Sequence, residues 1–331
     1  MRGDPAGRAL VTGGAGFIGS HVVSRLLRDG WSVRVLDDFS TGREQNLAGL
    51  ESDVEVIRAD VCDRAALDRA ALGVDVIFHQ AAIASVARSL SEPLRTNAVN
   101  LGGTLSVLDV ALARGVRRVV LAASAAVYGD GGPLPKVESL PACPLSPYAV
   151  QKYGSELYCR LYAGLYELET VALRYFNVYG PRQDPEGDYA AAIPLFIAAA
   201  LDGEAVRVFG DGEQTRDFVF VADVVEANLR ASAAAGVSGA VINVASGHQT
   251  SVNELVAVIG QCLGRELAAE HEAPRTGEVR HSWADIRRAR ELLGFEPAVD
   301  LKCGIGLTIE AFEAAGRSER ASNSGGGGLR A

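Results

Sequence analysis

Short runs of apolar residues alternate with longer amphipathic stretches through the first half of the chain. Five apolar runs have the length and composition of buried strands: residues 9–13, 32–38, 54–60, 74–82 and 116–124. The stretches between them carry apolar residues at helical spacing; one of them, 17–30, ends at a glycine. Continuous apolar runs separated by helices predict parallel strands that are covered on both faces. Because such crossovers are right-handed, the pattern predicts an α/β fold with a doubly wound parallel sheet, the Rossmann arrangement.

The second half of the chain has a less regular pattern. A predicted strand at 170–181 is followed by a polar loop, a helix at 191–203 and a short strand at 206–210. A further helix is predicted over 250–264, with Thr250 or Ser251 as its N-cap. The apolar run 241–246 is predicted to return to the main sheet.

These patterns divide the chain into three parts. Residues 1–177 are expected to form the sheet domain, and residues 217–246 to return to it. Residues 178–316 are expected to form a smaller C-terminal α/β lobe. The polar, glycine-rich residues 317–331 are expected to form a disordered tail, because they contain too little apolar surface to pack.

Composition narrows the class of protein. The chain has 331 residues and a formal net charge of −9, with no basic cluster to offset it, which argues against nucleic acid as a partner. Five scattered cysteines without a CxxC pair argue against a disulfide framework or a metal site. No uncharged apolar stretch reaches the roughly 18 residues of a membrane span, and the start resembles no signal peptide. We therefore expect a cytoplasmic protein that binds neither membranes nor metal ions.

A glycine motif links the first predicted strand to the first predicted helix. Gly13 allows a tight turn, Gly16 lets the backbone approach a pyrophosphate, and Gly19 lets the helix pack on the strand. The helix N-terminus then offers free amides to phosphate groups. Asp37 ends the next strand, where a carboxylate binds ribose hydroxyls and favours NAD over NADP. The neighbouring Asp38 is the competing candidate, although it can simply cap the loop.

A second group of residues can move a proton. Tyr148 and Lys152 are four residues apart in a predicted helix and therefore share one face. A nearby ammonium is expected to lower the pKa of Tyr148 from its usual value of about 10, so that the phenol can accept a proton from a hydroxyl. Ser124 ends a predicted parallel strand, at the edge where ligands bind, and can relay or steady the same proton. Tyrosine and lysine at this spacing can also form an ordinary surface pair, but their order after the glycine motif favours catalysis.

Six segments carry a resemblance to a known family. They are TGGAGFIGSH at 12–21, HQAA at 79–82, NLGGT at 100–104, SAAVYG at 124–129, YAVQK at 148–152 and RYFNVYGPRQDP at 174–185. Over about residues 8–316 the chain resembles the extended short-chain dehydrogenase/reductase family, and within it the NAD-dependent nucleotide-sugar epimerases. The resemblance implies that residues 1–177 bind NAD and that residues 178–316 bind a nucleotide-sugar.

The resemblance also implies a reaction. Tyr148 would take the proton from the sugar 4-hydroxyl while the 4-hydride goes to NAD. The 4-keto sugar would rotate and receive the hydride back on its other face. Ser124 would assist, and Lys152 would hold the nicotinamide ribose. Such enzymes are homodimers, and here the pairing helices would be residues 96–115 and the helix that bears Tyr148.

Two sets of binding residues follow from the resemblance and the motifs. The cofactor set is Gly13, Gly16, Phe17, Ile18, Gly19, Asp37, Asp38, Ser40, Thr41, Gly42, Asp60, Val61, Gln80, Ala81, Ala82, Asn100, Tyr148, Lys152 and Phe176. The UDP-sugar set is Ser124, Tyr148, Asn177, Val208, Arg216, Arg275, Glu278 and Ser282. Arginine suits the diphosphate because its planar fork binds phosphate through two hydrogen bonds.

Several alternatives remain open at this point. The related dehydratases and decarboxylases carry an acid just after the catalytic serine or threonine, whereas this chain has Ala125 and Ala126, which cannot transfer a proton. Ser282 matches a position that gates the sugar pocket, and a small residue there admits N-acetyl sugars beside UDP-glucose. UDP-glucuronate is a further candidate substrate, with Arg182 or Arg88 facing its carboxylate. A dehydratase or reductase, or a catalytically silent NAD sensor, would use the same fold.

Overall fold

The computed structural model describes residues 6–185, 191–274 and 279–324. Its centre is a seven-stranded parallel sheet with the order β11-β6-β5-β4-β1-β2-β3. The strands are β1 (Arg8–Thr12), β2 (Ser32–Asp37), β3 (Val54–Arg58), β4 (Val76–His79), β5 (Arg118–Ser124), β6 (Glu169–Tyr175) and β11 (Ala240–Val244). The predicted doubly wound fold is confirmed, and the run at 241–246 returns to the sheet, where β11 pairs with β6.

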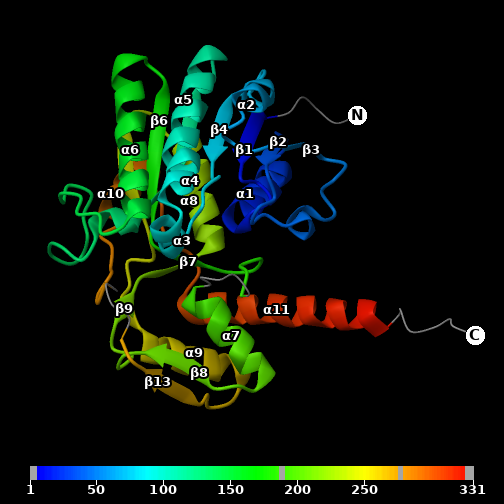
Figure 1. Cartoon of the computed structure of the whole chain (residues 1–331), viewed down its shortest axis with the longest axis vertical. Helices are drawn as coiled ribbons and strands as arrows, with labels where there is room; N and C mark the ends of the chain where they lie inside the picture. Colours follow the sequence, from blue (N-terminus) through cyan, green and yellow to red (C-terminus); the bar gives the residue numbers. More distant parts are fainter. Residues whose placement is uncertain (1–5, 186–190, 275–278, 325–331) are drawn as a thin grey trace, which may run out of the picture.

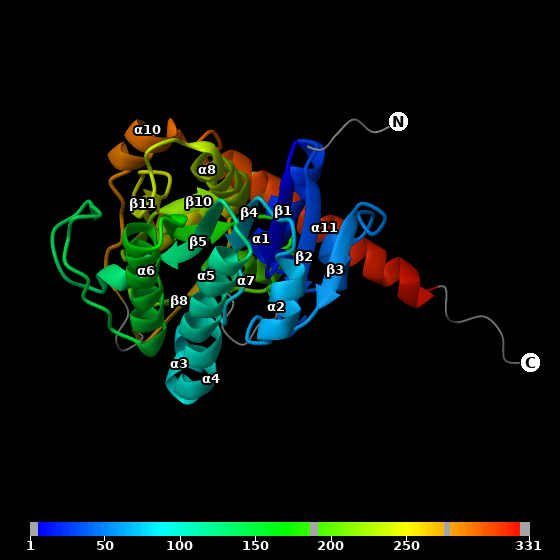
Figure 2. The same ribbon diagram turned by 90° about the horizontal axis from the view of Figure 1, so that it is seen from above.

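Helices cover both faces of this sheet (Figures 1 and 2). One face carries α1 (Phe17–Arg28), α8 (Val221–Ala233) and α10 (Arg287–Leu293), and the other carries α2 (Arg64–Ala70), α5 (Gly103–Ala113) and α6 (Pro147–Leu165). Successive strand residues alternate between the two cores: Val11 packs with the first group and Leu10 with the second. Both faces are therefore buried, as the continuous apolar runs predicted.

Shorter helices occupy the connections between these elements. They are η1 (Glu44–Leu47), α3 (Val86–Ser91), α4 (Pro93–Asn97), the π-helical turn η2 (Ala98–Gly102) and η3 (Ala125–Tyr128).

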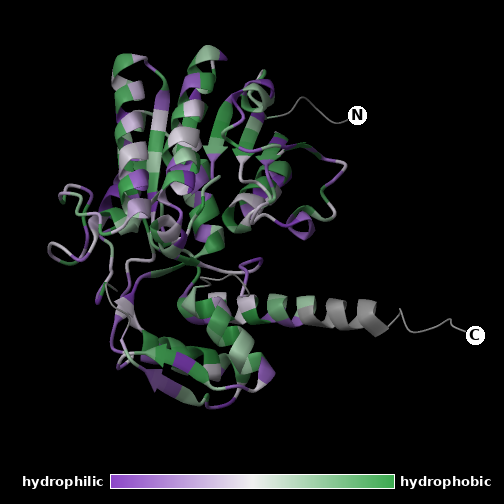
Figure 3. Cartoon of the chain, in the orientation of Figure 1, coloured by the Kyte–Doolittle hydropathy of each residue, from purple (hydrophilic) through white to green (hydrophobic). Residues whose placement is uncertain are grey.

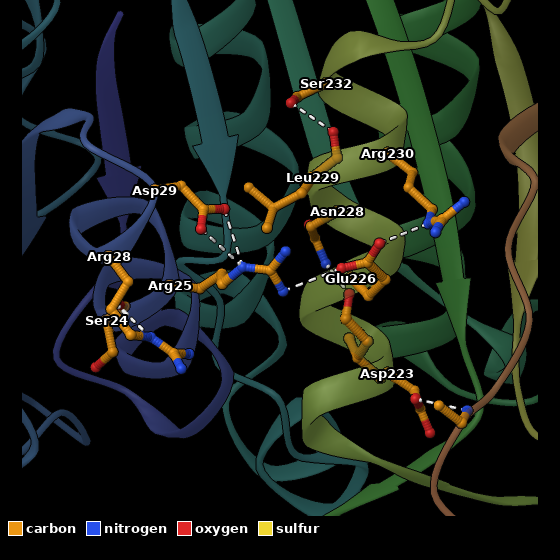
Figure 4. Close-up of polar contacts among 12 residues, drawn as sticks. Ser24, Arg25, Arg28, Asp29, Asp223, Glu226, Asn228, Leu229, Arg230 and Ser232 are labelled. Carbon is orange, nitrogen blue, oxygen red and sulfur yellow. Dashed lines mark hydrogen bonds and ion pairs between the residues drawn. The ribbon is translucent and has the colours of Figure 1, made fainter. Parts of the chain in front are cut away.

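Polar contacts also tie α1 to α8, as Figure 4 shows: Arg25 forms an ion pair of 3.0 Å with Glu226. Such half-exposed pairs contribute about 0–1 kcal/mol each, so the apolar core accounts for most of this packing.

The chain leaves the sheet at Phe176. The amide of Phe176 still donates to Val244 in β11, whereas the amide of Asn177 donates to Asp217. The predicted strand 170–181 is therefore two strands: β6 in the main sheet and β7 (Asn177–Tyr179), which pairs with β10 (Phe218–Phe220). A single continuous strand was the wrong prediction, because apolar composition alone does not show where a strand changes partner.

A smaller lobe follows, below the sheet in Figure 1. It contains α7 (Ala192–Asp202), β8 (Val206–Phe209), β9 (Thr215–Arg216), β12 (Thr250–Ser251), α9 (Val252–Leu263), β13 (Ala269–Glu272) and α11 (Leu301–Ser324). Its own apolar core includes Ile197, Val208, Leu255 and Ile305. Ser251 caps α9 in a capping box with Glu254, which decides between the two predicted N-caps. Strand β13 pairs with β8 in parallel, and it is exposed and hydrophilic along its length (Figure 3).

Helix α11 extends beyond residue 317, where the sequence predicted the start of a disordered tail. The helix runs from Leu301 to Ser324 and projects away from the body in Figure 1. Residues 317–321 (RSERA) include arginine, glutamate and alanine, which are good helix formers, so the helix can continue past the predicted start of the tail. No helix in the described part of the chain has the length and apolar character needed to cross a bilayer.

Candidate active site

The predicted site residues gather at the carboxyl ends of the parallel strands. In the strand register, Thr12 lies beside Leu36 and His79, and Ser124 lies beside Tyr175. The segments that follow β1, β2, β4, β5 and β6 therefore emerge at one edge of the sheet. The glycine motif, Asp37, Gln80, Ser124 and Phe176 all belong to this edge. This is the edge at which doubly wound sheets bind their ligands.

The glycine loop between β1 and α1 leaves no room for side chains. Gly13 has φ +69°, and a Cβ atom there would lie 2.6 Å from the amide nitrogen of Ala81. A Cβ atom on Gly19 would collide with the carbonyl oxygen of Gly13. Phe17 and Ile18, which lie between Gly16 and Gly19, pack against the core of the second lobe. The loop is thus a backbone-lined cradle between the two parts of the molecule.

Asp37 is buried at the end of β2 and faces this cradle. Its carboxylate accepts hydrogen bonds from the amides of Ala15 and Phe39, both at 2.8 Å. Burial raises the pKa of Asp37, although these two hydrogen bonds act in the opposite direction. A Cβ atom on Gly42 would lie 2.8 Å from the carboxylate, so the loop at Ser40–Gly42 closes directly over it.

Asp38 caps the loop that follows β2, which is the alternative role that the sequence allowed. Its carboxylate accepts hydrogen bonds from the amide and the hydroxyl of Ser40, at 3.0 and 2.7 Å, and so caps the loop. Ser40 and Thr41 are exposed beside it. Of the two adjacent acids, Asp37 is the one oriented toward the glycine loop.

The residues after β3 are engaged by the protein itself. Asp60 accepts a hydrogen bond from the amide of Cys62 and pairs with Arg95 of α4, both at 2.8 Å. Partial burial would raise the pKa of Asp60, but these two hydrogen bonds outweigh it and lower the pKa. The side chain of Val61 is buried and packs under Gly103. Val61 therefore has a packing role that its position in the motif did not reveal.

The remaining predicted cofactor residues lie at strand ends and contact other parts of the protein. Gln80 donates hydrogen bonds to Tyr175 and to Asn228, both at 3.1 Å. Ala81 and Ala82 continue the strand end beside the glycine loop. Phe176 is buried and its ring centroid lies 6.3 Å from that of Tyr128. These contacts fix the strand ends before any ligand binds.

Asn100 connects this edge to α6. It lies in the π-helical turn η2, a type of helix defect that is frequent at functional sites. Its side chain bonds both backbone groups of Ile83 and donates to the Gln151 side chain at 2.8 Å. Gln151 in turn donates to Thr96 at 3.0 Å. Because Gln151 lies between Tyr148 and Lys152, this network holds the helix that carries both.

The structure brings Ser124, Tyr148 and Lys152 together. Helix α6 begins with Ser146 as N-cap and Pro147 at its first position, so Tyr148 lies in the first turn. Ser124 ends β5; its hydroxyl accepts a hydrogen bond from the amide of Ala126 at 3.1 Å and interacts with the phenol of Tyr148. The Lys152 ammonium donates to the carbonyl of Ala122 at 2.8 Å and lies 6.0 Å from the centroid of the Tyr148 ring.

The pKa of Tyr148 differs from the sequence prediction. Burial raises the pKa of Tyr148, and the hydrogen bond with Ser124 opposes this only in part. Burial lowers the pKa of Lys152 to about 8, while the nearby Glu156 carboxylate acts in the opposite direction. The prediction of a lowered tyrosine pKa is therefore wrong. The Lys152 ammonium donates to the strand carbonyl of Ala122, and desolvation of the Tyr148 phenol has the largest effect on the pKa of Tyr148.

The predicted substrate residues have mixed outcomes. Asn177 is exposed at the start of β7, and Ser282 is bonded through its amide to the carbonyl of Thr215 at 3.0 Å. Arg216 lies beside them, and its guanidinium donates to the carbonyl of Thr215 at 2.9 Å. Arg275 and Glu278 lie outside the described residues.

Val208 does not line this site with its side chain. It is fully buried in the core of the second lobe, because alternate residues of β8 point inward. This burial leaves only the backbone of Val208 available to a ligand, and its neighbour Arg207 is the exposed residue.

Sequence reasoning missed two buried carboxylates near the site. Glu156, one turn after Lys152, forms a buried ion pair with Arg174 through two hydrogen bonds of 2.9 and 2.7 Å. Asp217, next to Arg216, accepts four hydrogen bonds in a fully buried position. Both lie within one helical turn of a predicted site residue along the chain, but a charged residue is usually exposed, so its type alone gave no signal.

Comparison with known proteins agrees with the family resemblance and the fold. Residues 9–245 match the model of the NAD dependent epimerase/dehydratase family. The chain is 44% identical over 309 residues to a UDP-glucose 4-epimerase of Mycolicibacterium smegmatis, covering 92% of this chain and 98% of the relative.

Two solved structures are also similar. One is a UDP-N-acetylglucosamine 4-epimerase from Methanobrevibacter ruminantium in complex with UDP-N-acetylmuramic acid, with TM-score 0.90, 38% identity and coverage of 94% of this chain and 99% of that one. The other is a UDP-glucose 4-epimerase from Thermotoga maritima with UDP-glucose, with TM-score 0.89, 39% identity and coverage of 93% and 99%.

Proposed function

This chain belongs to the NAD-dependent epimerase/dehydratase family, and we propose that it is a 4-epimerase of a UDP-hexose. Its substrates are the pair UDP-N-acetylglucosamine and UDP-N-acetylgalactosamine, the pair UDP-glucose and UDP-galactose, or both pairs. The similarity to a UDP-glucose 4-epimerase and to a UDP-N-acetylglucosamine 4-epimerase over more than nine-tenths of the chain supports this.

The convergence of Ser124, Tyr148 and Lys152 at the carboxyl edge carries the proposal. The ionised phenolate oxygen of Tyr148 takes the proton of the sugar 4-hydroxyl, and the neighbouring Ser124 side chain, which acts to lower the pKa of Tyr148, steadies it. Ala125 and Ala126 follow directly in η3, so the position where related dehydratases and decarboxylases carry an acid offers no proton donor. An oxidation and reduction at one carbon, without elimination or decarboxylation, is the chemistry that remains.

NAD is the cofactor of this family, and the glycine loop fits it. Helix α1 begins directly after Gly16 with no side chain capping it, so its first amides can bind a pyrophosphate, and the Asp37 carboxylate at the end of β2 can accept hydrogen bonds from ribose hydroxyls. When bound, NAD supplies a reversible hydride acceptor. Asp37 disfavours NADP, because its carboxylate would repel a 2′-phosphate.

Two arginines bear on the glucuronate alternative. Arg182 donates to the hydroxyl of Ser24 in α1 at 3.2 Å, and Arg88 pairs with Glu92 one turn along α3 at 3.5 Å. Both guanidiniums already have partners in the protein, which favours neutral hexoses over a sugar with a carboxylate. The small Ser282, held against β9 by its amide, supports the proposal that the pocket admits an N-acetyl group.

We further propose the division and assembly that the sequence suggested. Residues 1–177, with the returning segment 217–246, bind NAD, and residues 178–316 bind the nucleotide-sugar. A homodimer is supported by an exposed apolar stripe along α6, where Val150, Leu157, Leu161 and Leu165 are 40–67% exposed. Their spacing places them on one face of the helix.

A substrate panel with one enzyme preparation tests the proposed function. UDP-glucose, UDP-N-acetylglucosamine and UDP-glucuronate are incubated separately, and the products are identified by NMR. The proposal expects the C4 epimer from at least one of the first two substrates. Epimer from UDP-glucuronate alone would replace the proposed substrate, and no epimer from any substrate would leave an NAD-binding protein without this activity.

A further inference from the structure

Asp217 lies where four separate segments of the chain meet. It follows Arg216 directly, and its backbone carbonyl accepts a hydrogen bond from the amide of Asn177 at 3.0 Å. Its carboxylate accepts hydrogen bonds from the amides of Ser246 and Gly247, which follow β11. It also accepts one from the amide of Ala284, two residues after Ser282. We call these four segments (177, 215–217, 246–247 and 282–284) the lobe wall.

Each carboxylate oxygen of Asp217 accepts two hydrogen bonds. Oδ1 accepts from the amide and the hydroxyl of Ser246, at 2.8 and 2.6 Å. Oδ2 accepts from the amides of Gly247 and Ala284, at 3.1 and 3.2 Å. The side chain is completely buried, so water cannot replace any of these bonds. A further bond, from the Trp283 indole to the carbonyl of Gly247 at 2.9 Å, joins two of the same segments.

We propose that Asp217 is a positioning residue that sets the spacing of Asn177, Arg216 and Ser282 for the nucleotide-sugar. This inference rests on the proposed function and deepens it. The three substrate residues come from segments up to 105 positions apart, and Asp217 is the residue that meets all three: its carboxylate bonds Ala284, its backbone carbonyl bonds Asn177, and it follows Arg216 directly. Asp217 itself is sealed from solvent, so it acts on the ligand through these neighbours.

An amide cannot replace this carboxylate. All four bonds run toward Asp217, from three backbone N–H groups and one hydroxyl. In Asp217→Asn, one oxygen becomes an NH₂ group, which would point its hydrogens at backbone N–H donors. A buried donor without an acceptor is costly, so the segments would separate. We expect the substrate residues to lose their common geometry while the glycine loop and α6 keep theirs.

Asp223 provides a matched control six positions further along the chain, beyond strand β10. It is also buried, at 4% exposure, and its carboxylate accepts two backbone amides, those of Ala298 and Val299 at 2.9 and 3.3 Å. Figure 4 shows this residue at the start of α8. Its partners contain none of the proposed substrate residues. Asp223→Asn therefore reproduces the general cost of damaging a buried carboxylate without changing the lobe wall.

The experiment measures UDP affinity by calorimetry, together with KM, kcat, bound NAD and melting temperature, for wild type and both variants. Asp217→Asn is expected to weaken UDP binding and raise KM by about tenfold or more, with kcat and NAD content changed far less. Asp223→Asn is expected to lower the melting temperature with UDP affinity close to wild type. Equal losses of UDP affinity in the two variants, or an unchanged affinity in Asp217→Asn, would overturn the proposal.

Ser246→Ala is the milder second test and removes only the hydroxyl bond of 2.6 Å. It is expected to raise the Kd of UDP by about threefold, at a smaller cost in melting temperature than Asp217→Asn. An unchanged Kd in this folded variant would also contradict the positioning role. Failure of the proposed function gives a different result, because the wild-type protein itself would then form no epimer of UDP-glucose or of UDP-N-acetylglucosamine, whereas failure of this inference leaves wild-type epimerisation unchanged.

Discussion

The catalytic edge of the sheet and the lobe wall are held in place by different means. Ser124, Tyr148 and Lys152 lie on a central strand and a long helix, whose positions are set by two buried apolar cores. The lobe wall consists of short strands and turns that meet through a few hydrogen bonds, four of them to the one buried carboxylate of Asp217. Under the proposed function, the reaction belongs to the part held by apolar packing, and substrate choice belongs to the part held by a few polar bonds.

The largest effect should come from the catalytic edge. Tyr148→Phe removes the proton acceptor and keeps the ring, so kcat is expected to fall by about 10²–10⁴-fold while NAD stays bound. The measurement is epimer formation by NMR, with NAD content determined after denaturation. Tyr162→Phe, near the far end of α6, is the matched control and should turn over as wild type. Full turnover by Tyr148→Phe would remove this residue as the base.

The next effect should come from the lobe wall and depend on the substrate. Ser282→Tyr places a large ring at the proposed pocket gate, and it is expected to cut kcat/KM for UDP-N-acetylglucosamine about tenfold more than for UDP-glucose. Ser282→Ala keeps the position small and should retain both activities. Equal losses on both sugars would show that another residue gates the pocket.

A pH profile tests the charge of Lys152 at the catalytic edge of the sheet. With the pKa of Lys152 lowered to about 8, its ammonium is lost as the pH rises through that value, so kcat/KM is expected to fall on the alkaline side. In Lys152→Arg the guanidinium stays charged over this range, because its usual pKa is above about 12. This variant should be slower overall and lack the decline near pH 8. A decline that persists in Lys152→Arg would assign it to another group.

The smallest effect on chemistry should come from the surface of the rigid part. Leu161→Glu places a charge in the apolar stripe of α6, and it is expected to convert a homodimer to a monomer without changing the fold. Light scattering after gel filtration gives the mass, and circular dichroism gives the fold. Leu195→Glu is the control, since Leu195 is similarly exposed, at 42% against 51% for Leu161, but lies on α7 of the other lobe. A monomeric wild-type protein would contradict the dimer.

The same contrast explains what could be predicted from the sequence. The sheet, the glycine loop and the Tyr148–Lys152 pair follow from local patterns, because strand composition, glycine spacing and the i, i+4 rule act over short distances. The role of Asp217 depends on segments at 177, 246 and 284, and no local pattern shows that they meet. The burial of Val208 and the raised pKa of Tyr148 were missed for a related reason, since both depend on packing in three dimensions.

The most direct test of the account follows the hydrogen at C4 of the sugar. Wild-type enzyme is incubated in ordinary water with UDP-N-acetylglucosamine, and separately with UDP-glucose, each deuterated at C4, and the products are examined by NMR. The account predicts an epimer that retains deuterium at C4, because this hydrogen leaves and returns within the closed site while only the hydroxyl proton passes through Tyr148. An epimer that carries a solvent hydrogen at C4, or no epimer from either sugar, would contradict it.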